Sequence, residues 1–457
     1  MRNSNPVRWS SRFAFLMAAM GAAIGLANIW RFPYTAGVSG GGAFVFIYIG
    51  AVLLLALPLL VAEFMVGRRA AAPPARAMAE VALESGHSRH WGLVGVILGG
   101  AGSILTLSFY AIVGGWTMAY VVKIGSGSMQ DITARAAEST FSALNGDPLT
   151  LFAWFTAFIG VTVFVSARGI HAGVEKVVRV MMPALLVMLV VMVIYAMFVG
   201  DFSAALKFLF TPDFSRVDAK IIMAAFGQAF FSLSVGATNL MAYGQYMHKS
   251  TSIPRSALIV VAADTSVALL AGLAIFPIIF AFGLEPGAGP GVVFITMPFS
   301  FGQMSGGLIF GSIFFLLLFF AALTSSIAMM ESPVSWLNDR TRLGRIPAAL
   351  LSGTISWVLG ILAVLSLNRW ANFYPLDSVP LFAGKTFFDL YDFTVTNVLL
   401  PFGGIVIAIF VGWIMKKKFS SDELYGDHPT LWYSAWLFLV RFVAPLVLLA
   451  VFWDMLN

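Results

Sequence analysis

Two long apolar stretches of the chain are interrupted by small and polar residues of a kind that can bind ions and charged solutes. The first interruption is Gly21-Ala-Ala-Ile-Gly25, and the second is Ser232-Leu-Ser-Val-Gly-Ala-Thr238. Glycine and serine weaken a helix and free its backbone groups, which at membrane depth must be satisfied by protein, water or ligand. Such carbonyls and half-helix ends could hold a cation beside a charged small molecule. The alternative is that small residues merely let helices pack closely.

Asp264 is an acidic residue inside another apolar stretch. An ionised carboxylate at bilayer depth is costly and therefore usually paired or functional, although a protonated aspartate bonded to a neighbouring helix would also fit. Oxygen ligands suit a hard cation such as sodium. The chain has no cysteine, which excludes disulfides and soft-metal sites, and none of its five histidines pairs obviously with a catalytic acid. An intramembrane enzyme is therefore not expected.

The elements that must position these residues are membrane-spanning helices. Of 457 residues, 60% are hydrophobic and only 11% are charged, and the mean hydropathy is +0.91. A soluble domain is roughly half apolar and a quarter charged. We therefore expect an all-α polytopic membrane protein with about eleven transmembrane helices. Their expected ranges are 11–36, 41–67, 91–123, 150–167, 174–200, 220–246, 256–283, 306–336, 347–367, 388–415 and 431–455.

Basic residues indicate which ends of the helices face the cytoplasm. With the N-terminus inside, arginine and lysine concentrate in the inner segments, for example at Arg68 and Arg69 and from Lys416 to Lys418, and are sparse outside. This asymmetry follows the positive-inside rule. The net charge of +6 then faces anionic membrane lipid, and no nucleic-acid partner is expected. Because the first apolar stretch lacks a cleavage site, we expect a multi-pass protein of the plasma (inner) membrane with a cytoplasmic N-terminus.

The two interruptions lie five spans apart, which suggests paired structural repeats. We expect an inverted repeat of helices 1–5, residues 11–200, and helices 6–10, residues 220–415, as in many transporter folds. An additional eleventh helix would cover residues 431–455. The polar segments between spans are too short for a soluble domain, so whatever the protein does takes place within the membrane.

Long and specific sequence matches connect the chain with a known family. They are Gly21-Ala-Ala-Ile-Gly-Leu-Ala-Asn-Ile-Trp-Arg-Phe-Pro-Tyr34, Gly40-Gly-Gly-Ala-Phe44, Glu63, Trp116, Gln228-Ala-Phe-Phe-Ser-Leu-Ser-Val-Gly236 and Phe319-Phe-Ala-Ala-Leu-Thr-Ser-Ser326. The chain resembles the neurotransmitter:sodium symporters, and in particular their short bacterial members that carry hydrophobic amino acids. The resemblance implies a LeuT-type fold with helices 1 and 6 unwound at mid-membrane. It also implies a single transporter domain, residues 1–457, that imports an amino acid with sodium by alternating access.

The same resemblance implies two sodium sites. The first, together with the substrate carboxylate, would use the Ala23 carbonyl and the side chains of Asn28, Ser232 and Asp264. The second would use the Gly21, Ile24 and Ala321 carbonyls and the hydroxyls of Thr324 and Ser325.

Chloride is not expected to take part. Asp264 stands where the family usually carries asparagine, and Ala268 stands where chloride-dependent members carry a serine. Because Ala268 cannot hold an anion, we predict that Asp264 supplies the negative charge that chloride supplies elsewhere.

The resemblance also implies an α-amino acid site. Gly25 stands where monoamine carriers place an aspartate, and glycine leaves room and a backbone N–H for a carboxylate, which the Tyr110 hydroxyl would also hold. The substrate ammonium would face Ala22, Ala23, Phe231, Ser232 and the Ser325 hydroxyl. The side-chain pocket would be lined by Thr106, Phe231, Ser234, Ala237 and Met329. A small alanine and a deformable methionine there favour a bulky aliphatic or aromatic side chain.

The resemblance places gates on both sides of this site. On the outer side Arg31 and Asp392 would pair above a lid formed by Tyr110 and Phe231, although such a pair could instead anchor helix ends at the interface.

On the inner side Tyr246 and Asp339 match gate positions. Pro6 replaces the arginine that the family carries, which leaves Arg8 as the candidate substitute. The spacing of Gly173 and Pro183 favours local unwinding of the fifth span.

Two other functions remain compatible with these residues. The chain could be a sodium-dependent carrier of another small zwitterion or carboxylate, or a substrate-gated channel or sensor on the same fold. A channel usually shows a continuous ring of selective polar groups, and none is visible. The expected partners are the amino acid, Na⁺ at about two sites and membrane lipid, and the expected assembly is a monomer or weak homodimer.

Overall fold

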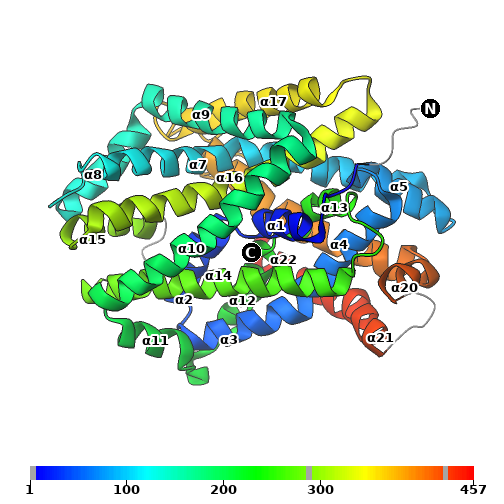
Figure 1. Ribbon diagram of the computed structural model, residues 1–457, viewed down its shortest axis with the longest axis horizontal. Coiled ribbons are helices and arrows are strands. Elements are labelled where there is room, and N and C mark those ends of the chain that lie inside the picture. Colours follow the sequence, from blue (N-terminus) through cyan, green and yellow to red (C-terminus); the bar gives the residue numbers. More distant parts are fainter. Residues whose placement is uncertain (1–6, 285–290, 426–430, 457) are drawn as a thin grey trace.

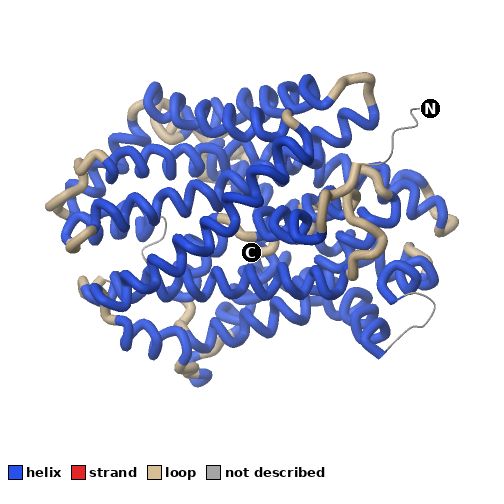
Figure 2. Tube along the Cα trace, viewed as in Figure 1, coloured by secondary structure: helices blue, strands red, loops and turns tan. Residues whose placement is uncertain are grey.

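The structure is a computed structural model that describes residues 7–284, 291–425 and 431–456. Over these residues it consists of helices and connecting loops without any strand, as Figure 2 shows. Lipid cannot satisfy backbone N–H and C=O groups, so helices that bond within themselves are the expected solution for so apolar a chain. The prediction of an all-α polytopic protein is confirmed.

Nine helical segments of the described residues are long and apolar enough to cross a membrane as continuous spans. Five of them are Pro148–Ala167 (α9), Ile170–Val199 (η5 Ile170–Glu175 and α10 Lys176–Val199), Ile253–Ala281 (α14), Gly307–Arg340 (α16) and Arg345–Ser366 (α17). Two more are Gly42–Ala70 (α3 Gly42–Ala51, η2 Val52–Ala56 and α4 Leu57–Ala70) and Arg89–Gly125 (η3 Arg89–Trp91, α6 Gly92–Gly95, η4 Val96–Gly102 and α7 Ser103–Gly125). The last two are Phe387–Ile414 (α18 Phe387–Phe393, η9 Thr394–Leu399, α19 Leu400–Ile409 and η10 Phe410–Ile414) and Leu431–Met455 (within α21 Leu431–Phe438, η11 Leu439–Val443 and α22 Ala444–Leu456). Each matches a span expected from hydropathy, with its ends displaced by several residues.

The first and sixth spans are broken at the expected places. The first consists of α1 (Arg12–Ala23) and the helical segment Ala27–Val38, which is bent from α1 by 52°. The sixth consists of α12 (Ala219–Ser232) and the short α13 (Asn239–Gly244). The prediction that helices 1 and 6 are unwound within the membrane is therefore confirmed.

Shorter helices cap the two ends of the bundle (Figure 1). We call the end that carries the N-terminus, α5 (Pro74–Glu84) and α20 (Lys417–Tyr425) the N-terminal face. The opposite face carries α8 (Ala134–Gly146), α11 (Phe202–Phe210) and α15 (Met297–Gln303).

The broken helix α1 lies in the middle of the bundle. It packs against α10, α14 and α16, and α16 also packs against α7 and α13. Every residue of α16 from Ala321 to Ser335 is buried, so this stretch is enclosed by protein on all sides. Polar residues within it, such as Thr324, Ser325 and Glu331, must therefore find partners inside the protein.

Candidate functional site

The break in the first span holds main-chain groups open beside α16. Helix α1 ends at Ala23, and Ile24 has an extended conformation with a ψ of 110°. The Asn28 side chain reaches back and accepts a hydrogen bond from the Gly25 N–H at 3.0 Å. A Cβ atom at Gly25 would lie only 2.7 Å from the Ser325 hydroxyl oxygen. Glycine at this position therefore allows the turn to approach α16 closely.

The break in the sixth span is stabilised by Glu63, a fully buried residue of α4. Its carboxylate accepts hydrogen bonds from the Gly236 N–H at 2.7 Å and the Met241 N–H at 3.1 Å. Ser234 and Thr238 have positive φ angles of 50° and 61°, which non-glycine residues rarely adopt. Sequence reasoning used Glu63 only as part of a resemblance and missed this role. An acidic residue inside an apolar stretch was the available signal.

Asn28, Ser232 and Asp264 form one connected polar cluster between the two breaks. The Asn28 amide donates to Ser232 Oγ at 2.9 Å and to Asp264 Oδ1 at 2.8 Å, and the Ser232 hydroxyl donates to Asp264 Oδ2 at 2.7 Å. All three side chains are fully buried. Their oxygens are the hard ligands that a sodium ion takes. Ala23, whose carbonyl completes the expected first site, is the buried last residue of α1.

A tyrosine that sequence reasoning did not single out joins this cluster. The Tyr48 hydroxyl of α3 lies 3.4 Å from Ser232 Oγ, and its ring is fully buried. Ala268, one turn along α14 from Asp264, is also fully buried and brings no polar atom to the cluster. Asp264 therefore brings the carboxyl group to the cluster that it forms with Asn28, Tyr48 and Ser232.

The groups expected for the second sodium also meet, where α1 and α16 touch. The Ser325 hydroxyl lies 3.3 Å from the Gly21 carbonyl oxygen and 3.2 Å from that of Ile24. The Thr324 hydroxyl lies 3.0 Å from the Phe320 carbonyl oxygen and 3.2 Å from that of Ala321, both within its own helix. A Cβ atom at Gly21 would lie 3.1 Å from Thr324 Cβ, so Thr324 also faces the end of α1. Carbonyl oxygens offer only lone pairs and hydroxyls can turn theirs inward, so these groups could hold a cation.

The Tyr110 hydroxyl marks a place for a ligand beside Gly25. Its oxygen is buried and forms no well-aligned hydrogen bond with the described residues, although Ser325 and the Leu26 main chain lie near it. A Cβ atom at Gly25 would lie 3.4 Å from this oxygen. Buried polar groups in proteins are almost always satisfied, so a hydroxyl without a well-aligned partner beside open main chain points to room for a polar ligand.

The residues expected around the substrate side chain come from three separate elements and the second break. Thr106 lies on α7, Phe231 on α12 and the buried Met329 on α16, while Ser234 and Ala237 lie in the break itself. Ala22, expected near the substrate ammonium, is buried near the end of α1. None of these side chains carries a charge, so they suit an uncharged side chain.

Toward the opposite face, the site is covered by Arg31 and Phe231. The Arg31 guanidinium lies over the Phe231 ring, with its carbon 4.0 Å from the ring centre. Arg31 and Asp392 do not form an ion pair within 4.0 Å, although both belong to the described part of the chain. The Asp392 carboxylate instead accepts from the Thr396 hydroxyl at 2.9 Å.

Toward the N-terminal face, the site is closed by Trp9 and a buried charge network. The Trp9 ring is 1% exposed, and its indole N–H donates to the Tyr243 carbonyl at 3.2 Å. The Tyr246 hydroxyl donates to Glu331 at 2.6 Å, and Arg345 donates to both oxygens of Glu331 at 3.0 and 2.5 Å. Sequence reasoning identified Tyr246 but missed Glu331 and Arg345.

Asp339, the other residue expected at the inner gate, lies outside this network. Its carboxylate is 3.2 Å from a guanidinium nitrogen of Arg76 on α5. Asp339 and Tyr246 line a cavity of about 480 Å³ at the N-terminal face, which Ser335, His171 and Arg345 also line. The two expected gate residues therefore share a cavity, although each has its own polar partner.

Comparisons with known proteins identify a family and several similar chains. The profile of the "Sodium:neurotransmitter symporter family" matches residues 7–131 and 147–457. An uncharacterized sodium-dependent transporter of Bacillus subtilis (strain 168) is 38% identical over 100% of this chain and 99% of its own length. One from Haemophilus influenzae is 33% identical over 98% of each chain. The crystal structure of MhsT in complex with L-phenylalanine matches with a TM-score of 0.88 and 36% identity, covering 99% of this chain and 100% of MhsT.

Proposed function

Because this chain belongs to the sodium:neurotransmitter symporter family and is a multi-pass, sodium-dependent transporter, we propose that it imports an α-amino acid together with sodium by alternating access. We further propose that the amino acid has a hydrophobic or aromatic side chain and that transport needs no chloride. The observation that carries the proposal is that buried oxygen groups gather beside both breaks, together with a Tyr110 hydroxyl that has no well-aligned hydrogen bond.

The substrate carboxylate would lie between the Gly25 main chain and the Tyr110 hydroxyl, beside the first sodium. Half-helix N-termini and free N–H groups favour an anionic group at this place. The ammonium would face Ala22, Ala23, Phe231, Ser232 and Ser325. The expected lining residues are all uncharged, which supports a substrate with an apolar side chain. MhsT, which was solved with L-phenylalanine bound, is consistent with such a substrate.

The two sodium sites would lie next to this substrate site. The first would be held by Ala23, Asn28, Ser232 and Asp264, and the second by Gly21, Ile24, Ala321, Thr324 and Ser325. The buried carboxyl group of Asp264, one helical turn from the apolar Ala268, supports transport without chloride. Sodium coupling then follows because the first ion would neutralise Asp264 and bind the substrate carboxylate at once.

We place the N-terminal face in the cytoplasm, in the inner membrane. The concentration of basic residues at the ends of spans on that face supports this orientation. Residues 11–200 and 220–415 would then act as inverted repeats, with Arg31, Asp392, Tyr110 and Phe231 gating the outer side and Tyr246 and Asp339 the inner side.

Uptake into proteoliposomes tests the proposal. A panel of radiolabelled amino acids should show saturable uptake against a gradient only with external sodium, and hydrophobic or aromatic members should compete best. Uptake should persist when gluconate replaces chloride. A strict chloride requirement would refute the role of Asp264, and conductance without accumulation would favour a channel.

Asp264→Asn sharpens the test. It removes the buried charge but keeps the shape, so we expect uptake at least tenfold lower or newly dependent on an anion. Glu138→Gln on the exposed surface of α8 also removes one negative charge and should leave uptake unchanged.

A further inference from the structure

The main chain at the N-terminus is held in place by histidine. The Nε2 atom of His248, in the loop after α13, lies 2.7 Å from the Trp9 carbonyl oxygen. The Nε2 atom of His171, in η5, lies 2.7 Å from the Arg8 carbonyl oxygen. A carbonyl only accepts hydrogen bonds, so both histidines must donate from Nε2. His171 also lines the cavity at the N-terminal face.

These contacts complete a main-chain clamp around Trp9. The Trp9 N–H donates to the Tyr246 carbonyl at 3.0 Å, and the Ser10 N–H donates to the buried Glu175 at 3.2 Å. The remaining main-chain group of Trp9, its carbonyl, accepts its hydrogen bond from His248. His248 is partly buried, whereas His171 is exposed. Water competes less at His248, so this residue should contribute more to closure than His171.

No arginine of the N-terminal segment performs this task in the described residues. Asp339 is engaged by Arg76 at 3.2 Å, and Arg8 forms no ion pair with Asp339 within 4.0 Å. The sequence had suggested an ion pair between Arg8 of the N-terminal segment and Asp339 of α16. The structure instead holds this segment through histidine side chains that bind its main chain.

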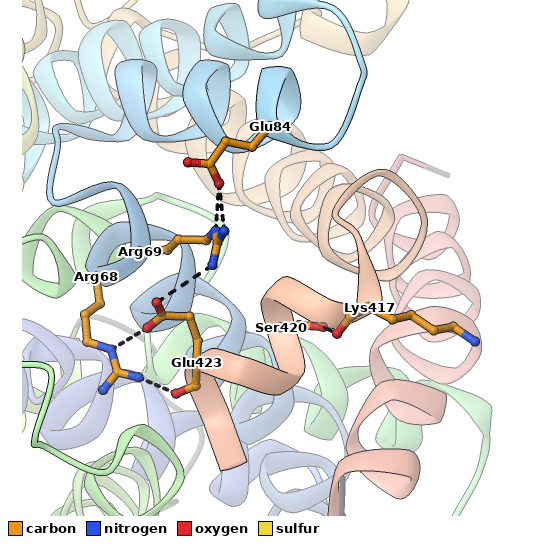
Figure 3. Close-up of polar contacts among 6 residues, drawn as sticks. All are labelled: Arg68, Arg69, Glu84, Lys417, Ser420 and Glu423. Atoms are coloured by element: carbon orange, nitrogen blue, oxygen red, sulfur yellow. Dashed lines mark hydrogen bonds and ion pairs between the residues drawn. The ribbon is translucent and has the colours of Figure 1, made fainter. Parts of the chain in front are cut away.

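The position of His248 is itself fixed by a buried charge cluster. Three residues further along the same loop, the Thr251 carbonyl accepts a hydrogen bond from Arg68 at 2.5 Å. The Arg68 guanidinium, with 5% of its side chain exposed, also pairs with Glu423 of α20 at 2.9 Å. Figure 3 shows Arg68 and Glu423 facing each other between α4 and α20. The loop that carries His248 is thus held to both elements.

We propose that His248 is the latch of the cytoplasmic gate, a positioning residue that holds Trp9 over Tyr243 and Tyr246, with His171 as a weaker second contact. Loss of the His248 bond frees the N-terminal segment and raises the population of the state that is open to the cytoplasm. This inference rests on the proposed alternating-access cycle and on the cytoplasmic placement of the N-terminal face.

The test uses the absence of cysteine from the chain. Ser335→Cys introduces one thiol in the cytoplasmic cavity, where Ser335 is 7% exposed. In purified full-length protein, the rate at which a polar maleimide labels this thiol reports how often the gate is open, without any need to know the substrate. His248→Ala, His248→Gln and His248→Asn are then each combined with Ser335→Cys.

We expect His248→Ala to raise the labelling rate about fivefold, the population change that the loss of one ordinary net hydrogen bond produces. His248→Gln should restore slow labelling, because its amide nitrogen reaches the position of Nε2, whereas the shorter His248→Asn should not. His171→Ala should change the rate less than twofold. Lys249→Ala, an exposed neighbour, is the matched control and should have no effect.

Equal labelling of His248→Ala and the parent would overturn the proposal, as would a His248→Gln variant that labels as fast as the alanine variant. If His248→Ala cannot be purified, the comparison of His248→Gln with His248→Asn decides alone, since both are polar and differ in reach. Failure of amino acid uptake in the parent would instead contradict the proposed function, and it would leave the labelling rates interpretable.

Discussion

At the N-terminal face the site is closed by a fully buried tryptophan and by Glu331, which Tyr246 and Arg345 both bind. At the opposite face one guanidinium lies over one ring, and Asp392 binds Thr396 instead of Arg31. Buried charges bonded to each other cost about 3–5 kcal/mol to separate. A cation–π contact contributes about 0.5–1 kcal/mol when exposed and about 2 kcal/mol when desolvated, and Arg31 and Phe231 are both partly buried. The comparison indicates that the N-terminal face is the firmly closed one and the opposite face the easier one to open.

The largest effect is expected from a substitution that breaks the buried ion pair of Arg345 and Glu331. Arg345→Gln leaves the Glu331 carboxylate, which is 0% exposed, without its cation. We expect a loss of about 3–5 kcal/mol of stability, seen as a lower thermal unfolding midpoint in detergent. The double variant Arg345→Met with Glu331→Gln should recover part of the loss, because it removes both charges. Unchanged melting of Arg345→Gln would show that Glu331 is neutral or solvated.

A smaller effect is expected from Trp9→Phe. It keeps most of the buried ring but removes the indole N–H that donates to the Tyr243 carbonyl at 3.2 Å. That carbonyl still accepts from the Tyr246 N–H at 3.2 Å, so the variant loses one ordinary hydrogen bond, worth about 1 kcal/mol. Maleimide labelling of Ser335→Cys should therefore become roughly fivefold faster. Labelling at the parent rate would mean that ring packing alone closes this face.

Removal of the outer contact should matter less. Arg31→Gln loses the cation above Phe231, worth about 1 kcal/mol, so bound amino acid should dissociate roughly fivefold faster in a scintillation proximity assay. Phe231→Leu removes the ring instead of the cation and is the matched variant. A dissociation rate unchanged in Arg31→Gln would place the outer closure on other residues.

The smallest effect on dissociation of the bound amino acid is expected from a change at Asp392. This residue is exposed and does not form an ion pair with Arg31 within 4.0 Å. Asp392→Asn should change the dissociation rate less than twofold, because exposed charges without good partners contribute about 0.5 kcal/mol or less. An effect as large as that of Arg31→Gln would instead show that the two residues pair in another state of the cycle.

Much of the fold could be predicted from local sequence. The apolar stretches and the two interruptions identified the spans and their breaks, because a helix in lipid must satisfy its backbone within a short segment. The same reasoning singled out Asp264, since a lone carboxylate in an apolar stretch is conspicuous. The residues named for the ion and substrate sites came from a resemblance. The structure brings Asn28, Ser232 and Asp264 together and places Ser325 against the end of α1, whereas the roles of these residues stay predictions.

Other features depend on partners that lie far apart in the chain. Glu63 supports the break around Gly236, 173 positions later, and Glu331 binds Arg345 from the next span. The sequence shows that these charges are present at membrane depth but not which groups they meet.

The sequence by itself determined that this protein crosses the membrane repeatedly, that two of its helices are interrupted and that oxygen-bearing residues lie at or near those breaks. Only the tertiary structure decided that Asp339 binds Arg76 and that His248 binds the carbonyl of Trp9. The physical reason is that burial is set by local composition, whereas a long charged or imidazole side chain can reach several partners. Packing of distant helices selects one of them.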